Sequence, residues 1–390
     1  MRVFVVDPSL FTPQYDAPLC AALQALHDVD LMCRPSRADE VDVTGPHRVR
    51  RLFYAVSERL RRTRLAPLAG PAKVLEHVVD LGRLAWRVRA ERPDVVHVQW
   101  LVVPVVDRLA FLAMRRWAPV VLTVHDTTPM HDAARSALQT VGTSRALAAA
   151  DHLVVHTEFS RNELGSAGLE LGRITVVPLG QMAPVSATAG GRAGEGDEDG
   201  DGEDVRLLVF GRIRPYKGVD VLLSALARMG EPQRRRVRVH IAGSPLMDME
   251  PLYRQAQELG VAGQVRWSPR FLDDGEVAAC FAEADVAVLP YRDVDASSSL
   301  GVALAEGLPV IASRIGGFAE LLTHGEDALL FEVDDADGLA GCIEEMLDPD
   351  RRRAIAAGAA RLAGTVPTWA EIARRTTAVY DEVRARHRAS

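Results

Sequence analysis

Short runs of apolar residues alternate with longer stretches of helical spacing along most of the chain. Five apolar runs in the first half predict buried strands: "RVFVV" near the N-terminus and residues 94–100, 120–126, 151–157 and 173–180. Stretches with helical spacing lie between them, for example at residues 18–27 and 73–91. Strands that alternate with helices in this way indicate parallel sheets built from βαβ units.

The same alternation resumes after residue 204, with apolar runs at residues 205–210, 236–243, 264–269, 284–291 and 308–313. Between the two halves, residues 184–204 are rich in glycine and acidic residues, which predicts a solvated linker or a surface insertion. We therefore predict an α/β protein with two doubly wound, Rossmann-like domains, at residues 1–183 and 205–368. In this architecture a ligand binds in the cleft at the carboxyl ends of the strands.

Composition and charge are those of an ordinary globular protein. The chain has 390 residues, of which 48% are hydrophobic and 25% charged, and its net charge is −7. This charge argues against nucleic acid as a general partner. The four cysteines, Cys20, Cys33, Cys280 and Cys342, form no C-x-x-C pair and predict reduced thiols in a cytoplasmic protein. No apolar run approaches the roughly 18 residues of a membrane span.

One strand–loop–helix segment predicts a bound anion. In "FGRIRPYKGVD" (residues 210–220), Arg212, Arg214 and Lys217 lie where an apolar run ends and a helical pattern begins. Helix N-termini attract anions, and added cations strengthen that attraction. The alternative is a pair of ordinary surface cations. No G-x-G-x-x-G follows the first strand and no Walker loop is present, which disfavours hydride transfer and P-loop chemistry.

The motifs "FGRIRPYKGVDVLLSAL", "ADVAVLPYR" and "GLPVIASRIGGFAELL" together resemble the retaining glycosyltransferases of family 4, which have the glycosyltransferase-B fold. The resemblance is strong over residues 205–331 and extends more weakly to "DVVHVQW" and "LTVHDTTP". It implies that residues 1–183 face the acceptor, that 205–368 bind a UDP- or GDP-linked sugar, and that a helix at 369–390 crosses back to the first domain. The implied acceptor is a glycan, a lipid-linked sugar or a small molecule, and neither metal nor cofactor is needed.

The resemblance assigns the donor site to two helix starts and their neighbours. Arg212 and Lys217 would hold the diphosphate, because two fixed cations can stabilise the charge of the leaving group. Arg214, between them, is expected to face the solvent. The remaining donor-binding candidates are Gly211, Arg270, Ser297, Ser298, Ser299, Leu300, Gly316 and Gly317. Plain helix capping by one serine, an ordinary turn at the glycine pair and a surface role for Arg270 are the alternatives.

The chain departs from the family where two glutamates usually contact the donor sugar and the ribose. The corresponding positions are Val294 and Val302, and neither is acidic. Asp295 and, four residues after Val302, Glu306 are the carboxylates that could replace them. This departure puts the sugar and ribose contacts in doubt.

In the first half the resemblance places His125 near the transferred sugar, where it would position or polarise it. A metal site at His125 and His131 is disfavoured, because their six-residue spacing fits no standard ligand pattern. Ser9, Phe11, Gln99 and Trp100 are the acceptor-side candidates, while His97 is either on the same face or in the core.

Residues 48–64 are rich in arginine and predict an amphipathic helix with a basic face. It is either a solvated helix or a peripheral contact with the inner face of a membrane. Other functions stay open as well: a catalytically silent sugar-nucleotide-binding scaffold, or an epimerase or phosphorylase with the same fold.

Overall fold

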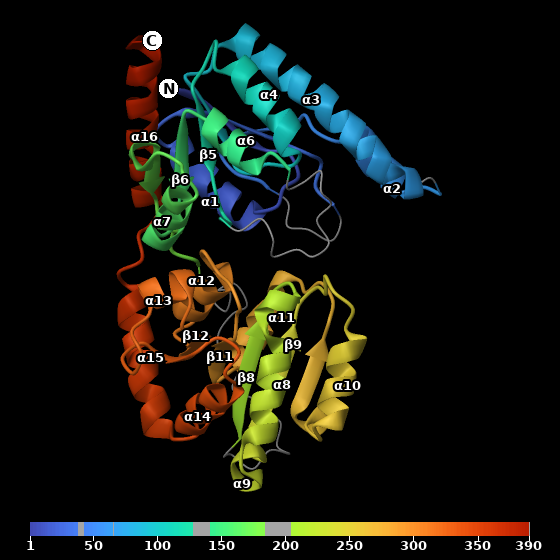
Figure 1. Ribbon diagram of the computed structural model, residues 1–390, viewed down its shortest axis with the longest axis vertical. Coiled ribbons are helices and arrows are strands. Elements are labelled where there is room, and N and C mark those ends of the chain that lie inside the picture. The colour runs from blue at the N-terminus through green and yellow to red at the C-terminus, as the bar shows by residue number, and fades with distance from the viewer. Residues whose placement is uncertain (38–42, 65, 128–140, 184–203, 390) are drawn as a thin grey trace. The chain divides into compact units, whose positions relative to one another are not determined.

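The computed structural model describes residues 1–37, 43–64, 66–127, 141–183 and 204–389 (Figure 1). His131 and nearly all of the acidic segment 184–204 lie outside these residues. Contacts divide the chain into two units, one formed by Met1–Gly180 with Pro367–Ser390 and one formed by Gln181–Val366. Each unit contains its own parallel sheet with helices beside it, which confirms the predicted α/β class with two Rossmann-like domains.

The first unit contains a seven-stranded parallel sheet with the order β3-β2-β1-β4-β5-β6-β7. Its strands are β1 (Arg2–Asp7), β2 (Asp28–Cys33), β3 (Arg48–Arg51), β4 (Val95–Val98), β5 (Val120–Thr123), β6 (His152–Val155) and β7 (Ile174–Val176). The chain moves outwards from β1 to β3 and then returns to β4 on the other side of β1. A ligand site is expected at this change of direction, beyond the carboxyl ends of β1 and β4.

Seven α-helices are described in the first unit (Figure 1): α1 (Pro13–Gln24), α2 (Ala55–Arg61), α3 (Ala69–Glu91), α4 (Pro104–Met114), α6 (Thr143–Ala149), α7 (Glu158–Ser166) and α16 (Trp369–Ala389). Short 3-10 turns occupy Ala66–Leu68 and Leu171–Arg173. Helix α1 begins at Pro13, five residues before the predicted start, because proline is well suited to the first turn of a helix.

Helix α16 belongs to the core of the first unit although it comes from the end of the chain. It packs along α1 and buries Ile372 and Tyr380 beside the strands. The Tyr380 hydroxyl lies 2.6 Å from Nδ1 of His97 on β4, and Arg384 bonds to Asp94 at 2.5 Å. His97, whose Nε2 lies 2.7 Å from the Thr123 hydroxyl, is therefore a satisfied core histidine.

The second unit contains a six-stranded parallel sheet with the order β10-β9-β8-β11-β12-β13. Its strands are β8 (Val205–Phe210), β9 (Val237–Ala242), β10 (Val265–Ser268), β11 (Val286–Leu289), β12 (Val310–Ser313) and β13 (Ala328–Phe331). Its helices are α8 (Val219–Arg228), α9 (Glu231–Arg234), α10 (Glu250–Glu258), α11 (Asp274–Glu283), α12 (Ser298–Ala305), α13 (Gly316–Leu321), α14 (Ala336–Met346) and α15 (Pro349–Ala363), with 3-10 turns at Pro215–Lys217 and Ala262–Gln264. The direction changes between β8 and β11, so the expected ligand position is at their carboxyl ends.

The predicted helix over residues 48–64 is wrong in its first part. Residues 48–51 form the edge strand β3, and only Ala55–Arg61 form helix α2. Pairing across strands explains the difference, since Arg48 and Arg50 both form ion pairs with Asp30 on β2. Among the described residues, no helix is both long enough and apolar enough to cross a bilayer.

Candidate functional site

The turn after β8 brings Gly211, Lys217 and Ser299 together. Gly211 has a φ of +116°, which only glycine adopts readily, and a Cβ at this position would lie 3.1 Å from Ser299 Oγ and 3.5 Å from Lys217 Nζ. Gly218 begins α8 with a φ of +64°, and there a Cβ would lie 1.8 Å from the carbonyl oxygen of Pro290. Gly218 therefore lets the turn Pro215–Lys217 approach the chain just after β11 closely, and Gly211 leaves room for Ser299 and Lys217.

Lys217 is a buried cation whose described partners are uncharged. It is 7% exposed, its Nζ donates a hydrogen bond to the hydroxyl of Tyr291, and it lies 3.9 Å from the centre of the same ring. Burial lowers the pKa of Lys217 to about 8, an effect that Tyr216 opposes and Arg214 reinforces. Within the described chain no carboxylate forms an ion pair with Lys217. A buried ammonium without a counter-ion is unfavourable, so this position suits a bound anion.

Of the two arginines of the turn, Arg214 differs from its predicted position. Arg212, expected beside Lys217, is exposed, whereas Arg214, expected to face the solvent, is half-buried and close enough to depress the pKa of Lys217. The irregular path between Gly211 and Lys217 explains this, because helical or strand spacing does not apply in such a turn.

The serine-rich start of α12 contributes to the cluster of Gly211, Lys217 and Ser299. Ser297 is the N-cap, and its Oγ accepts the N–H of Leu300 at 3.3 Å. Ser299 Oγ donates to the carbonyl of Phe210 at 3.2 Å and so ties α12 to the end of β8. Burial raises the pKa of Tyr291 to about 12, while hydrogen bonds with Ser299 and Ser297 act against this rise.

Ser298 is exposed and Leu300 is buried in the core, so the hydroxyl groups of Ser297 and Ser299 are the ones that face the buried cluster. The helix N-terminus, the ammonium of Lys217 and these hydroxyl groups form an electropositive site in which negative charge is favourable.

Val294 occupies the position of a family carboxylate, and it has a structural role. Its side chain is 6% exposed and lies in the core, while its carbonyl accepts the N–H of Gly317 at 3.0 Å. Gly316, with a φ of +48°, begins α13 beside it. Asp295 is 4% exposed, whereas Glu306 lies at the opposite end of α12, about 12 Å along the helix from its start.

Arg270 is exposed and is held in place by the first turn of α11. Its guanidinium bonds both carboxylate oxygens of Glu276, at 2.8 and 2.5 Å. Glu276 also completes a capping box with Asp273. Arg270 lowers the pKa of Glu276 to about 2, so this pair stays ionised at neutral pH.

Sequence reasoning missed two residues of the "LPYR" motif that support the Lys217 site. Tyr291 is the partner of Lys217, and Arg292 bonds both carboxylate oxygens of Asp220 at 2.9 and 2.6 Å and the carbonyl of Pro215 at 2.9 Å. Arg292 thereby fixes the turn that carries Lys217. The sequence did contain a signal for these two residues, because both follow a buried strand of a parallel sheet, where ligand sites are expected.

In the first unit, Asp7 organises the loop between β1 and α1. Its buried carboxylate accepts the N–H groups of Ser9 at 3.1 Å and of Phe11 at 2.7 Å. Leu10, between them, has a φ of +48°, a strained conformation for a branched side chain. Burial raises the pKa of Asp7 and raises that of Asp16, its neighbour on α1, still further. The hydrogen bonds to the buried carboxylate of Asp7 therefore fix the conformation of the loop.

Four of the predicted residues meet at the end of this loop. Trp100 stacks on His125 with ring centres 4.9 Å apart and receives the edge of Phe11 at 5.4 Å. Gln99 Oε1 lies 3.3 Å from His125 Nε2. Ser9 lies on the same loop as Phe11 but has other contacts.

His125 is held as a neutral imidazole by His156, which sequence reasoning missed. His156 Nδ1–H donates to the carbonyl of Val177 at 2.9 Å, so its Nε2 accepts from His125 Nδ1–H at 3.0 Å. His125 Nε2 then carries a lone pair, and rotating the amide of Gln99 places its otherwise unpaired Nε2–H against that lone pair. Burial is the main cause that lowers the pKa of His125, and His156 and His97 lower it further.

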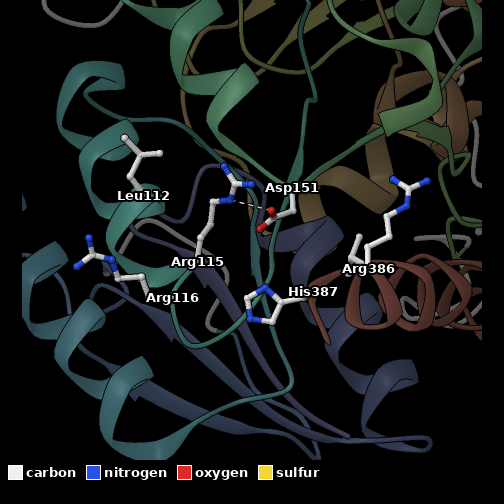
Figure 2. Close-up of a pocket in the computed structure, with 7 residues that line it drawn as sticks. Leu112, Arg115, Arg116, Asp151, Arg386 and His387 are labelled. Atoms are coloured by element: carbon white, nitrogen blue, oxygen red, sulfur yellow. Dashed lines mark hydrogen bonds and ion pairs between the residues drawn. The ribbon is translucent and has the colours of Figure 1, made fainter. Parts of the chain in front are cut away.

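A separate pocket of about 410 Å³ lies where β6 begins, lined by Leu112, Arg115, Arg116, Asp151, Val383, Arg386 and His387 (Figure 2). Arg115 is engaged by Asp151 at 2.7 Å, while Arg116 and Arg386 point away from each other. None of the predicted site residues lines this pocket. Among the described residues, no group of three or more His, Cys, Asp or Glu side chains could hold a metal ion.

Two family models match the chain: "Glycosyltransferase Family 4" over residues 17–180 and "Glycosyl transferases group 1" over residues 204–349. Curated relatives include the D-inositol 3-phosphate glycosyltransferases of Geodermatophilus obscurus (32% identical, 74% of this chain and 66% of the relative) and Thermobispora bispora (32%, 75% and 71%). The chain spans about two thirds of the length of these relatives.

Solved structures with the same fold include HepE of Anabaena in complex with UDP and glucose, at 18% identity and a TM-score of 0.72, covering 98% of this chain and 100% of HepE. Another is an α,α-trehalose-phosphate synthase (UDP-forming) from Burkholderia vietnamiensis, at 15% identity and a TM-score of 0.73, covering 100% of this chain and 98% of the synthase.

Proposed function

The chain belongs to the group 1 glycosyltransferases of family 4, with the glycosyltransferase-B fold, and from that membership we propose that it transfers a sugar with retention of configuration. The donor is a nucleotide-diphosphate sugar, linked to UDP or GDP, which binds to the second unit. The acceptor is a glycan, a lipid-linked sugar or a small molecule, which binds to the first unit.

The observation that carries this proposal is the buried ammonium of Lys217 beside the start of α12. It has a phenol and no carboxylate as its described partner, and two serine hydroxyl groups face that phenol. A diphosphate bound there supplies the missing counter-charge. The same contacts strengthen as the diphosphate departs with additional negative charge, which lowers the barrier to transfer.

His125 positions the transferred sugar in this proposal. As a neutral imidazole stacked on Trp100 and held by Gln99 and His156, it contacts the sugar without a charge that would favour the substrate over the transition state. The bond from the sugar carbon to the phosphate oxygen breaks as the acceptor oxygen bonds on the same face. The proton of the acceptor hydroxyl passes to the leaving phosphate, so no side chain is required as a base.

UDP is the first nucleotide to test, because HepE was solved with UDP and glucose, and a phosphorylated cyclitol is the first acceptor, because the relatives are named for D-inositol 3-phosphate. Stability against UDP, GDP, ADP and dTDP is measured first, followed by product analysis. A site filled at 100 times its dissociation constant adds about 2.7 kcal/mol. A failure of all four nucleotides to stabilise the protein contradicts the proposal.

A catalytically silent sugar-nucleotide-binding scaffold is the second candidate, and the core position of Val294 favours it. Incubation with the donor distinguishes the two. A scaffold binds the nucleotide but releases neither product nor free sugar, whereas a transferase slowly hydrolyses the donor even without acceptor. An epimerase or phosphorylase converts the donor without transfer.

The peripheral membrane contact considered for residues 48–64 would involve α2 and the residues that follow it, because residues 48–51 form strand β3. Arg59, Arg61, Arg62 and Arg64 are exposed there, next to Val56, which is 56% exposed. Sedimentation with vesicles containing anionic lipid tests this contact, with Arg61→Gln/Arg62→Gln as the variant. Equal binding of variant and wild type contradicts it.

A further inference from the structure

Tyr15, in the first turn of α1, touches three other aromatic rings of the first unit. Its ring centre lies 4.9 Å from that of His125 and 5.2 Å from that of His156, with interplanar angles of 86° and 60°. The third ring is that of Trp369, with centres 5.4 Å apart and planes at 73°. Tyr15 is 4% exposed. One buried ring therefore contacts both histidines of the site and also the first residue of α16.

The position of Tyr15 is fixed by the residues before it and by the sheet. The carbonyl of Thr12 accepts the N–H of Tyr15 at 2.9 Å, and the hydroxyl of Thr12 accepts Trp100 Nε1–H at 3.0 Å. Burial raises the pKa of Tyr15, while a hydrogen bond with Thr123 on β5 acts against this rise. Trp100, which stacks on His125, is thus tied to the same turn of α1 as Tyr15.

These contacts leave the imidazole of His125 little freedom to move. Its two nitrogens lie within hydrogen-bonding distance of Gln99 and His156, and its ring lies nearly parallel to that of Trp100, at an interplanar angle of 14°. Tyr15 adds a perpendicular ring to this arrangement. Because Tyr15 also contacts α16, it connects the orientation of His125 to a helix from the end of the chain.

Trp369, at the start of α16, lies against the backbone of Gly180. A Cβ at Gly180 would be 2.6 Å from Cδ2 and 2.7 Å from Cε2 of the indole, so a larger residue at this position has to displace the ring. The start of α16 is a capping box, in which the Thr368 N–H donates to Glu371 at 2.8 Å and the Glu371 N–H donates to the Thr368 hydroxyl at 3.3 Å. The indole therefore extends from a fixed helix start onto a glycine that leaves room for it.

Gly180 and Trp369 lie where the chain passes between the two units. Gly180 is the last residue of the first unit before the chain enters the second, and Pro367 is the first residue after it returns. The contact between Trp369 and Gly180 thus joins these two crossings within the first unit. A continuous series of contacts leads from the crossings through Trp369 and Tyr15 to His125.

We propose that Tyr15 and Trp369 are positioning residues for the sugar transfer, which hold the imidazole of His125 and make its orientation depend on the two chain crossings. This inference rests on the proposed function, in which His125 contacts the transferred sugar. Tyr15 acts on His125 directly, and Trp369 acts through Tyr15. Enzymes built from two domains commonly rearrange at their connections when a ligand binds. A nucleotide bound to the second unit therefore changes the surroundings of His125 through these two rings.

The imidazole of His125 can be observed directly by NMR. The full chain is labelled with ¹⁵N at its 11 histidines, and a His125→Gln variant assigns the two ring nitrogens of His125. UDP, or GDP if UDP does not bind, is added to saturation, and its affinity for each variant is measured separately by calorimetry. In the wild type the ring ¹⁵N signals of His125 should shift when the nucleotide binds.

Gly180→Ala tests the contact that lies furthest from His125. The added methyl group displaces the indole of Trp369, so the nucleotide-dependent shift of His125 should be lost while the nucleotide still binds. Gly82→Ala, in the same unit with open space around it, is the control and should keep the shift.

The outcomes separate the inference from the proposed function. Equal shifts of His125 in the wild type and in Gly180→Ala overturn the inference. A nucleotide that binds without any shift of His125 in the wild type also overturns it and leaves the proposed function intact. Binding of neither nucleotide overturns the proposed function and the inference with it.

Kinetics test the positioning role of Tyr15 independently, with hydrolysis of UDP-glucose in the absence of acceptor as the first assay. Tyr15→Leu should lower kcat about 10- to 100-fold with little change in the KM for the donor, because a displaced His125 affects the reacting atoms and not the binding of the nucleotide. Tyr15→Phe keeps the ring and should retain most of kcat. A purely structural role predicts a loss of stability in Tyr15→Leu without a loss of kcat, and that result overturns the inference.

Trp369→Leu should lower kcat in the same way as Tyr15→Leu. Trp117→Leu is the matched control, because Trp117 is also a half-buried tryptophan of the first unit but lies before β5, at the opposite end of the strand that leads to His125. Urea unfolding checks that each variant is folded, and Trp369→Phe replaces the leucine variant if that variant is not. Equal kcat values for the Trp369 and Trp117 variants overturn the inference.

Discussion

Replacing Lys217 with methionine should stabilise the ligand-free protein and weaken its response to nucleotide. Burial lowers the pKa of Lys217 from 10.5 to about 8, so the folded state holds the charged form at a cost of about 3 kcal/mol below pH 8. Methionine has a similar shape and no charge, so it removes this cost. The wild type recovers the same energy only between about pH 8 and 10.5, where the folded state has released the proton and the unfolded state has not.

The assay is urea unfolding of the wild type and Lys217→Met at pH 7, 8, 9, 10 and 10.5, each with and without UDP. Lys73 titrates in the same range, because burial lowers its pKa to about 8, but it is present in both proteins and cancels in their difference. The variant should be more stable at pH 7 by up to about 3 kcal/mol, and the difference should vanish near pH 10.5. With UDP the order should reverse or narrow, because a charge-assisted hydrogen bond contributes about 1.5–3 kcal/mol. A variant that is less stable at pH 7, or a difference independent of pH, refutes the reasoning.

Three further variants test other parts of the structure. Gly218→Ala should lower the free energy of unfolding by about 2 kcal/mol or more in urea, because a Cβ there clashes with a backbone carbonyl and the φ of +64° disfavours alanine. Gly263→Ala is the control and should not lower it, because the space around Gly263 is open. Asp16→Asn should be tolerated at pH 7. Because burial keeps the Asp16 pKa raised in the folded state, the wild type should lose stability as pH rises above about 4, and the variant should not. A wild-type stability curve that is flat from pH 4 to 7 contradicts this. Tyr380→Phe should cost about 1–3 kcal/mol by leaving buried Nδ1 of His97 unpaired, and an unchanged midpoint speaks against that bond.

The sequence predicted most of the strands because parallel strands buried on both faces are apolar runs. It missed β13 (Ala328–Phe331), a four-residue apolar run, as well as β2 (Asp28–Cys33) and β3 (Arg48–Arg51), in which charged residues lie among apolar ones. Those charges are satisfied by residues from other elements, as when Asp30 pairs with Arg2, Arg48 and Arg50. Such pairing is not local, so no window along the chain displays it.

The same limit applied to the sites. Lys217 and the serines were recognised because each lies at a junction of strand and helix. Their partner Tyr291 is 74 residues from Lys217, and His156 is 31 residues from His125. Spacing cannot reveal contacts that depend on which strands are neighbours, so the chemistry of both centres became clear only with the sheet order.

Helix α16 has a consequence for the synthesis of the protein. The second unit is continuous in sequence, whereas the first requires Ile372 and Tyr380 from the last helix to complete its core. Residues leave the ribosome at about 5–20 per second, N-terminus first. The second unit can therefore fold during translation, while the first half of the chain must wait, with the α1 surface that α16 covers open to water, until α16 has emerged. This unit, although made first, is the one whose folding is completed last.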